Sequence, residues 1–104
     1  MFLFCMIPQD VIDSIHWDID RMIQNMSNEV TLFTSSFVKS KYDYEHTVDF
    51  MYGFEIGRLH RLFSYMMAEK GNGATPAELV EFAELVFKRA STIRYAILKV
   101  IPPD

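Results

Sequence analysis

Apolar side chains recur every three or four residues along most of this chain, which is the spacing of one face of an α-helix. Pro8 suits a first helical position, and Asp10 and Asp13 complement the positive end of a helix dipole. We predict a first helix over residues 8–38, with a kink or break near residues 27–28, where weaker helix formers begin. Its apolar face comprises Ile12, Ile15, Ile19, Met22, Ile23, Met26, Val30, Phe33 and Phe37.

A second helix is predicted over residues 44–70, closed by Gly71. It carries two apolar stripes. The first is Val48, Tyr52, Ile56, Leu59, Phe63 and Met66, and the second is Met51, Phe54, Leu62 and Tyr65. Because a helix that is apolar on two sides lies between neighbours, we expect this helix at the centre of the fold. The connection over residues 39–45 is short enough to make the first two helices antiparallel.

The third helix has the clearest start signal in the chain. Thr75 suits an N-cap, Pro76 the first helical position and Glu78 the third, which together form a capping box. A regular apolar spacing follows and ends before two prolines, so we predict a helix over residues 76–100. Its apolar positions are Leu79, Phe82, Val86, Ala90, Ile93, Ile97 and Val100.

These elements predict an all-α fold: one domain over residues 1–104, built as an antiparallel bundle of three long helices. Half of the 104 residues are hydrophobic, including nine Phe, five Tyr and seven Met. That is more large apolar surface than a small core requires. We therefore expect the bundle to complete its core against a second copy or another chain.

The stretch YGFEIGRLHRLF, residues 52–63, places two glycines one turn apart inside the second helix. Each glycine costs about 1 kcal/mol relative to alanine in a helix, so a compensating contact is expected. We predict that Gly53 and Gly57 let a neighbouring helix approach closely, which would make Gly57→Ala destabilising. Arg58 and Arg61 should then extend towards the aspartates of the first helix. The sequence assigns no role to His60.

Charge and cysteine content narrow the function classes. The formal net charge is −4, which argues against nucleic-acid binding, although Lys88, Arg89, Arg94 and Lys99 gather near the end of the third helix. The single cysteine, Cys5, excludes an internal disulfide and fits a reducing compartment. The apolar opening MFLFCMI is too short to cross a membrane. We expect a cytoplasmic protein that does not insert into membranes.

The first helix presents the most suggestive surface. Asp10, Asp13, Asp18 and Asp20 surround Trp17, with Arg21 as the one cation among them. Carboxylates around an aromatic side chain are suited to binding a basic protein, because the charges steer the encounter and the ring anchors it. We predict a non-enzymatic interaction protein without a cofactor. Its most specific form is an immunity protein or antitoxin that blocks a basic toxin or nuclease.

Two alternatives come from other classes. Asp13, His16 and Asp20 share a helical face that loosely resembles the ligand spacing of carboxylate metal bundles, with His46 or His60 as further ligands. The matching glutamates of such bundles are absent. The second alternative is a dimeric scaffold or a subunit of a larger assembly. No serine or cysteine stands in the context of an activated nucleophile.

Overall fold

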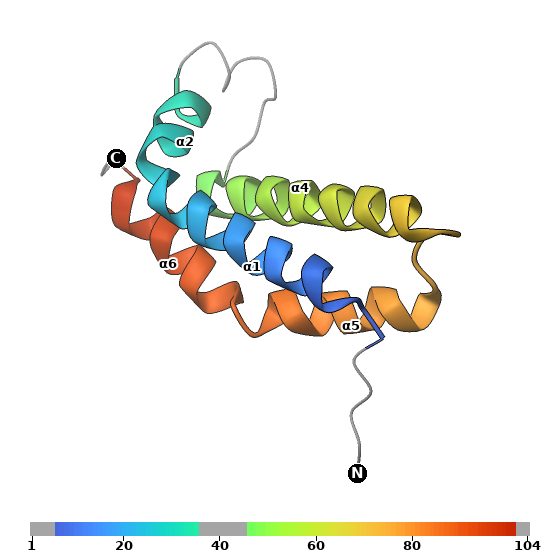
Figure 1. Cartoon of the computed structure of the whole chain (residues 1–104). Helices are drawn as coiled ribbons and strands as arrows, with labels where there is room; N and C mark the ends of the chain where they lie inside the picture. The colour runs from blue at the N-terminus through green and yellow to red at the C-terminus, as the bar shows by residue number, and fades with distance from the viewer. Residues whose placement is uncertain (1–5, 36–45, 102–104) are drawn as a thin grey trace.

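The computed structural model describes residues 6–35 and 46–101, and those ranges are all-α, as predicted (Figure 1). The helices in these ranges are α1 (Gln9–Gln24), α2 (Met26–Phe33), α4 (Thr47–Lys70), α5 (Pro76–Phe87) and α6 (Ala90–Val100). The structure is not the expected bundle of three long helices: the first predicted helix is divided, as the expected kink or break allowed, and the third is divided where no break was expected. The predicted helix boundaries at 38 and 44, the connection 39–45 and Cys5 lie outside the described residues.

The first division falls at Asn25, two residues before the expected break. Asn25 has φ −97° and ψ 8°, which ends α1 and begins α2, and Figure 1 shows α2 turning away from the direction of α1. The apolar step from Met22 to Met26 spans this residue without interruption, so the apolar spacing does not reveal the change of direction. Both helices pack against the same hydrophobic core. Its members from α1 are Val11, Ile15, Ile19 and Met22, and those from α2 are Met26, Val30 and Phe33.

The second division, at residues 88–89, was not expected. Arg89 has φ −109° and ψ 2°, so the chain changes direction between α5 and α6. Here too the apolar steps from Val86 to Ala90 and Ile93 stay regular, which hides the break from periodicity. The guanidinium of Arg89 bonds to α1, at the His16 carbonyl oxygen and the Asp20 carboxylate. We infer that this tertiary contact offsets the helical hydrogen bonds lost at the break.

The connection from α4 to α5 follows the predicted local signals. Gly71 is the C-cap of α4, with φ +156°, and Gly73 has φ +83°, in the region that favours glycine. The capping box at the start of α5 is confirmed. Thr75 Oγ1 accepts a 3.2 Å bond from the Glu78 amide, and Glu78 Oε1 accepts a 2.8 Å bond from the Thr75 amide.

As expected, α4 occupies the centre of the fold, in contact with α1, α2 and α6. Its buried side chains are Met51, Glu55, Leu59, Phe63 and Met67. The predicted second stripe is only partly covered, because Phe54 and Tyr65 are exposed.

The chain leading into α1 is held on α5, where the Glu81 carboxylate accepts hydrogen bonds from the backbone amides of Met6 and Ile7. None of the helices in the described ranges is long and apolar enough to cross a bilayer.

Candidate functional site: an apolar groove between α4 and α5

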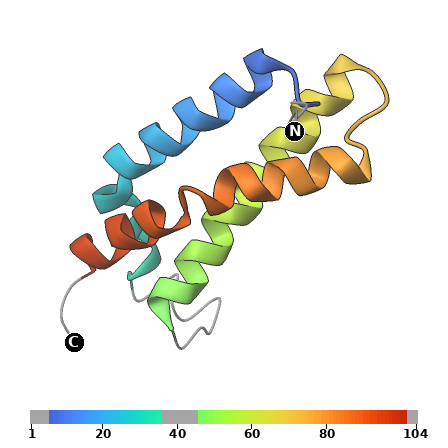
Figure 2. The same ribbon diagram turned by 90° about the horizontal axis from the view of Figure 1, so that it is seen from below.

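An open apolar groove of about 660 Å³ lies between α4 and α5. Figure 2 shows α5 crossing α4 at an angle before the chain continues into α6. From α4 the groove is lined by Tyr52, Gly53, Ile56, Gly57 and His60, and from α5 by Leu79, Phe82, Ala83, Val86 and Phe87. We call this the α4–α5 groove.

Phe82 joins the two helices that form the groove. Its ring stacks on that of Phe63, with centroids 4.6 Å apart and planes 14° apart, and both side chains are buried. The ring of His60 meets Phe82 edge-on at 5.8 Å. The helices therefore meet through large side chains. Such contacts hold their backbones apart and leave the groove open above the aromatic pair.

Gly53 and Gly57 line the groove on its α4 side, where both are exposed. A Cβ atom built on either glycine meets nothing within 4 Å in the described part of the chain. The close helix approach expected at these glycines is therefore not made by any described segment of the same chain. The physical reason is the stacked Phe82, which brings α5 to α4 through side chains.

The α5 wall exposes apolar side chains to solvent. Among the lining residues, Phe87 is 78% exposed and Leu79 is also exposed. Val80, on the same helix but outside the lining set, is 59% exposed. By helical register, Glu84 lies beside this apolar edge, and Arg61 lies one turn beyond Gly57 on the α4 side. Both charged side chains are exposed, and neither has an ion pair or side-chain hydrogen bond to the rest of the described chain. The α5 side of the groove thus carries apolar side chains that the described chain leaves uncovered, and the two charged residues lie outside the groove lining.

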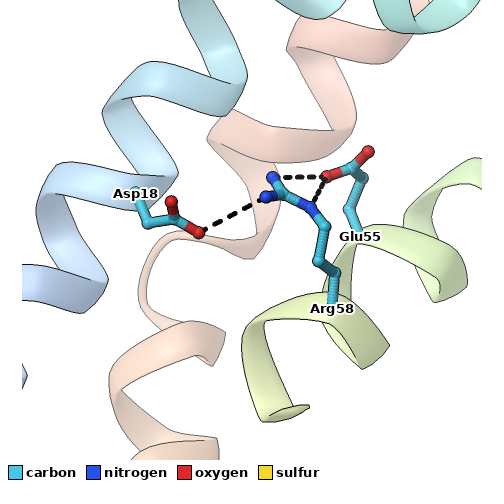
Figure 3. Close-up of polar contacts among 3 residues, drawn as sticks. All are labelled: Asp18, Glu55 and Arg58. Atoms are coloured by element: carbon cyan, nitrogen blue, oxygen red, sulfur yellow. Dashed lines mark hydrogen bonds and ion pairs between the residues drawn. The ribbon is translucent and has the colours of Figure 1, made fainter. Parts of the chain in front are cut away.

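Elsewhere on α4, Arg58 bridges the buried carboxylate of Glu55 on the same helix and Asp18 of α1 (Figure 3). Glu55 Oε2 accepts bonds from Arg58 Nη2 at 3.1 Å and Nε at 3.3 Å, and Arg58 Nη1 lies 3.6 Å from Asp18 Oδ2. The prediction that Arg58 extends towards an aspartate of the first helix is confirmed. Arg61 makes no such contact with the described residues.

Glu55 is suited to positioning α4 and not to catalysis. Its side chain has no exposed surface, and Oε1 has no hydrogen-bond partner in the described chain. Burial raises the pKa of this carboxyl above its ordinary value, and the Arg58 charge opposes that rise. A substrate in solution cannot reach the carboxylate. The nearby polar hollow of about 280 Å³ is lined by Asp18, Arg21, Met22, Asn25, Glu29 and Arg58, whose charges balance.

Most aspartates of the predicted acidic binding face form ion pairs with cations of the same chain. Asp10 pairs with Lys70 at the end of α4, Asp18 with Arg58, and Asp20 with Arg89. Asp13 is exposed and accepts a bond from Gln9 on its own helix. Trp17 is 60% exposed, with the Arg21 guanidinium 5.0 Å from its ring centroid. Asp13 and Trp17 are therefore the parts of this face most available to a partner.

The alternative metal site is not assembled among the described residues. Arg89 lies between its members: Nη1 is 3.3 Å from His16 Nδ1, while Nη2 bonds to Asp20. No group of three His, Cys, Asp or Glu side chains in the described ranges has an arrangement that could hold a metal ion. His46 stands at the N-cap of α4 and His60 lies in the groove, so neither joins His16.

Sequence reasoning missed two features of these sites, and each had a signal. Glu55 stands four residues from both Met51 and Leu59, at the register of the buried stripe. Val80 and Phe87 are seven residues apart and off the predicted apolar face of their helix, which indicates a second apolar edge.

No family model, curated protein or solved structure gives a significant match to this chain. The functional argument therefore depends on the geometry.

Proposed function

We propose that this protein is a non-catalytic interaction module that binds a protein segment in the α4–α5 groove. The observation that carries the proposal is the open apolar groove itself, lined in part by Phe87, a large side chain that lies mostly in solvent. Contiguous exposed apolar surface on a small protein typically marks a contact site. A groove between two helices is suited to an amphipathic helix, whose apolar face can fill it.

The composition of the groove supports binding over catalysis. His60 is the one readily titratable side chain among its lining residues, and its ring packs edge-on against Phe82. The lining set holds no carboxylate, serine, threonine, cysteine or lysine that could act together with this imidazole. A catalytic histidine ordinarily works with such a group, which orients the ring or is activated by it.

The groove is a better candidate for the contact surface than the acidic face of α1. An inhibitor that covers the basic site of a toxin or nuclease needs carboxylates that can leave their present partners. Asp10, Asp18 and Asp20 already face cations of the same chain, so exchanging those partners would gain little. We therefore assign the proposed contact to the groove, and the identity of the inhibited or assembled partner stays a prediction.

Site-specific photo-crosslinking in the source cells tests this proposal. A benzophenone amino acid replaces Ala83, an exposed residue of the groove, and in a matched protein it replaces exposed Asp13 on α1. We expect a discrete protein adduct from position 83 and a much weaker one from position 13. Adding Phe87→Glu to the first protein should remove the adduct. A strong adduct from position 13 alone would move the contact to the acidic face, and no adduct from either would contradict the proposed function.

A further inference from the structure

The break between α5 and α6 has no local feature that would end one helix and begin the next. Lys88 and Arg89 are good helix formers, and neither glycine nor proline stands beside them. Arg89 is the N-cap of α6 but makes no side-chain capping bond, in contrast to Thr75 at the start of α5. The break is therefore held by contacts with another part of the fold, and Arg89 makes them.

The guanidinium of Arg89 meets three acceptors on α1. Its Nη1 lies 3.3 Å from the backbone carbonyl oxygen of His16 and 3.3 Å from Nδ1 of the His16 ring, and its Nη2 bonds to the Asp20 carboxylate. A guanidinium only donates hydrogen bonds, so Nδ1 must be the unprotonated, accepting nitrogen of the ring. The contact therefore requires a neutral His16. A proton on Nδ1 would set an N–H group and a positive charge against the guanidinium.

We propose that the α5–α6 break is a pH-sensitive latch, closed by Arg89 on neutral His16 and opened when the imidazole takes up a proton. Histidine side chains change charge between about pH 5 and about pH 8. Proton binding and the docking of Arg89 exclude one another at Nδ1, so the latch weakens as pH falls and strengthens as pH rises. This inference goes beyond the proposed function and does not depend on it.

The other charged groups around His16 favour opening. On α1, Asp13 lies one turn before His16, and Asp20, which Arg89 already binds, lies one turn after it. Across from them stand Arg89 and its neighbour Lys88, which is exposed and has no ion pair within the described ranges. The two carboxylates stabilise a charged ring. Asp20 would then be shared between two cations, which weakens the hold of α1 on Arg89.

Opening the latch would alter one end of the α4–α5 groove. Phe87 lines the groove and stands two residues before Arg89. The rest of α5 stays anchored through Phe82, which is stacked on Phe63, and α6 stays anchored through the buried Ile93. The change is therefore confined to the last turn of α5 and the first turn of α6, where it frees Phe87 to move relative to α4.

Hydrogen exchange of backbone amides tests the latch on the full purified chain. The amide of Arg89 bonds to the Val86 carbonyl and that of Ile93 to the Arg89 carbonyl, so both report on the break. Their protection factor is the intrinsic exchange rate divided by the observed rate at the same pH. It should fall about fivefold between about pH 7.5 and about pH 5.5. The Leu79 amide, bonded to Thr75 at the other end of α5, is the internal control and should change by less than about twofold.

Three variants assign the effect to the latch. His16→Gln keeps an acceptor but cannot take up a proton, so the fall should vanish. Arg89→Met should lower the protection of Ile93 about fivefold at about pH 7.5, with no further fall on acidification. His46→Gln, at an exposed histidine without a capping bond on α4, is the matched control and should keep the wild-type fall. Burial raises the pKa of Glu55, but this carboxyl is present in every variant and cannot account for differences between them.

Any of four results would overturn the latch. They are wild-type protection at the break that does not change with pH, a fall that persists in His16→Gln, a fall that disappears in His46→Gln, and an equal fall at Leu79. If Arg89→Met does not fold, the comparison of the wild type with the two histidine variants decides. No partner enters these measurements, so their outcome is independent of the crosslinking test of the groove.

Discussion

Arg58 Nη2 donates a 3.1 Å hydrogen bond to Oε2 of Glu55, a carboxylate with no exposed surface. Through the same guanidinium, Glu55 is linked to Asp18 of α1. The helix that lines the groove is thus fixed to α1 by an ion-pair network, while its glycines face open space.

The buried carboxyl should make stability depend on pH. Burial raises the pKa of Glu55 above 4.5, so the folded protein holds this proton more tightly than the unfolded chain. Its contribution is therefore fully present below pH 4.5 and is lost as pH rises through the folded pKa. We expect the wild-type free energy of unfolding, minus that of Glu55→Gln, to fall over the interval that begins at about pH 4.5 and extends to higher pH. Urea titrations across this interval measure it.

Asp49→Asn is the matched control for that experiment, because Asp49 is an exposed carboxylate paired with Arg94. The wild-type free energy of unfolding, minus that of Asp49→Asn, should not fall over the same pH interval. A Glu55→Gln curve that is flat across the interval, or that rises, would show that burial does not govern this carboxyl.

Removing the cation should leave the buried charge without its hydrogen-bond donors. We expect Arg58→Met to lower the free energy of unfolding at neutral pH by about 2 kcal/mol, less than for a fully buried pair because the Arg58 side chain is 40% exposed. In a Glu55→Gln background the same substitution should cost much less. Chemical denaturation of the four proteins gives the coupling energy, and additive effects would contradict the assigned network.

Alanine at Gly57 should stabilise the monomer, in contrast to the expectation from sequence. The space beside Gly57 is open, so helix propensity decides the sign, and we expect a gain of about 0.5–1 kcal/mol in the free energy of unfolding. Gly73→Ala is the contrasting variant and should be destabilising, because Gly73 has φ +83°. Thermal melts at the lowest practical protein concentration check both. A loss of stability at Gly57 would require a close neighbour at that site.

Two phenylalanines of α5 should differ sharply in their contribution to stability. Phe82 is buried and stacked on Phe63, so Phe82→Ala should cost about 3–4 kcal/mol. Phe87 is mostly exposed, so Phe87→Ala should change the stability of the dilute protein by less than about 0.5 kcal/mol. Urea denaturation measures both. Similar losses at the two positions would mean that Phe87 is covered within the monomer.

The sequence was informative where a local interaction determines the structure. The capping box of Thr75 and Glu78 is sufficient to begin α5 at the predicted residue, and apolar spacing placed Ile15 and Ile19 in the core. The sequence did not reveal the helix breaks, whose positions depend on tertiary contacts. The breaks at Asn25 and Arg89 leave the apolar steps intact, so periodicity passes through them.

The candidate site was foreseen in part. The two glycines drew attention to the α4 side of the groove, but the distance between α4 and α5 depends on the stacking of Phe82 on Phe63. That contact joins residues far apart in the chain and has no local signature. The ion pairs that engage the acidic face were not foreseen for a related reason, because the cations that bind Asp10 and Asp20 come from distant helices.

The most direct test of the groove as a contact surface is the photo-crosslink from position 83 in the source cells. We expect a discrete protein adduct at this position that Phe87→Glu removes, and a much weaker adduct from position 13 on α1. The absence of an adduct from position 83, or a strong adduct from position 13 alone, would contradict the assignment of the contact to the α4–α5 groove.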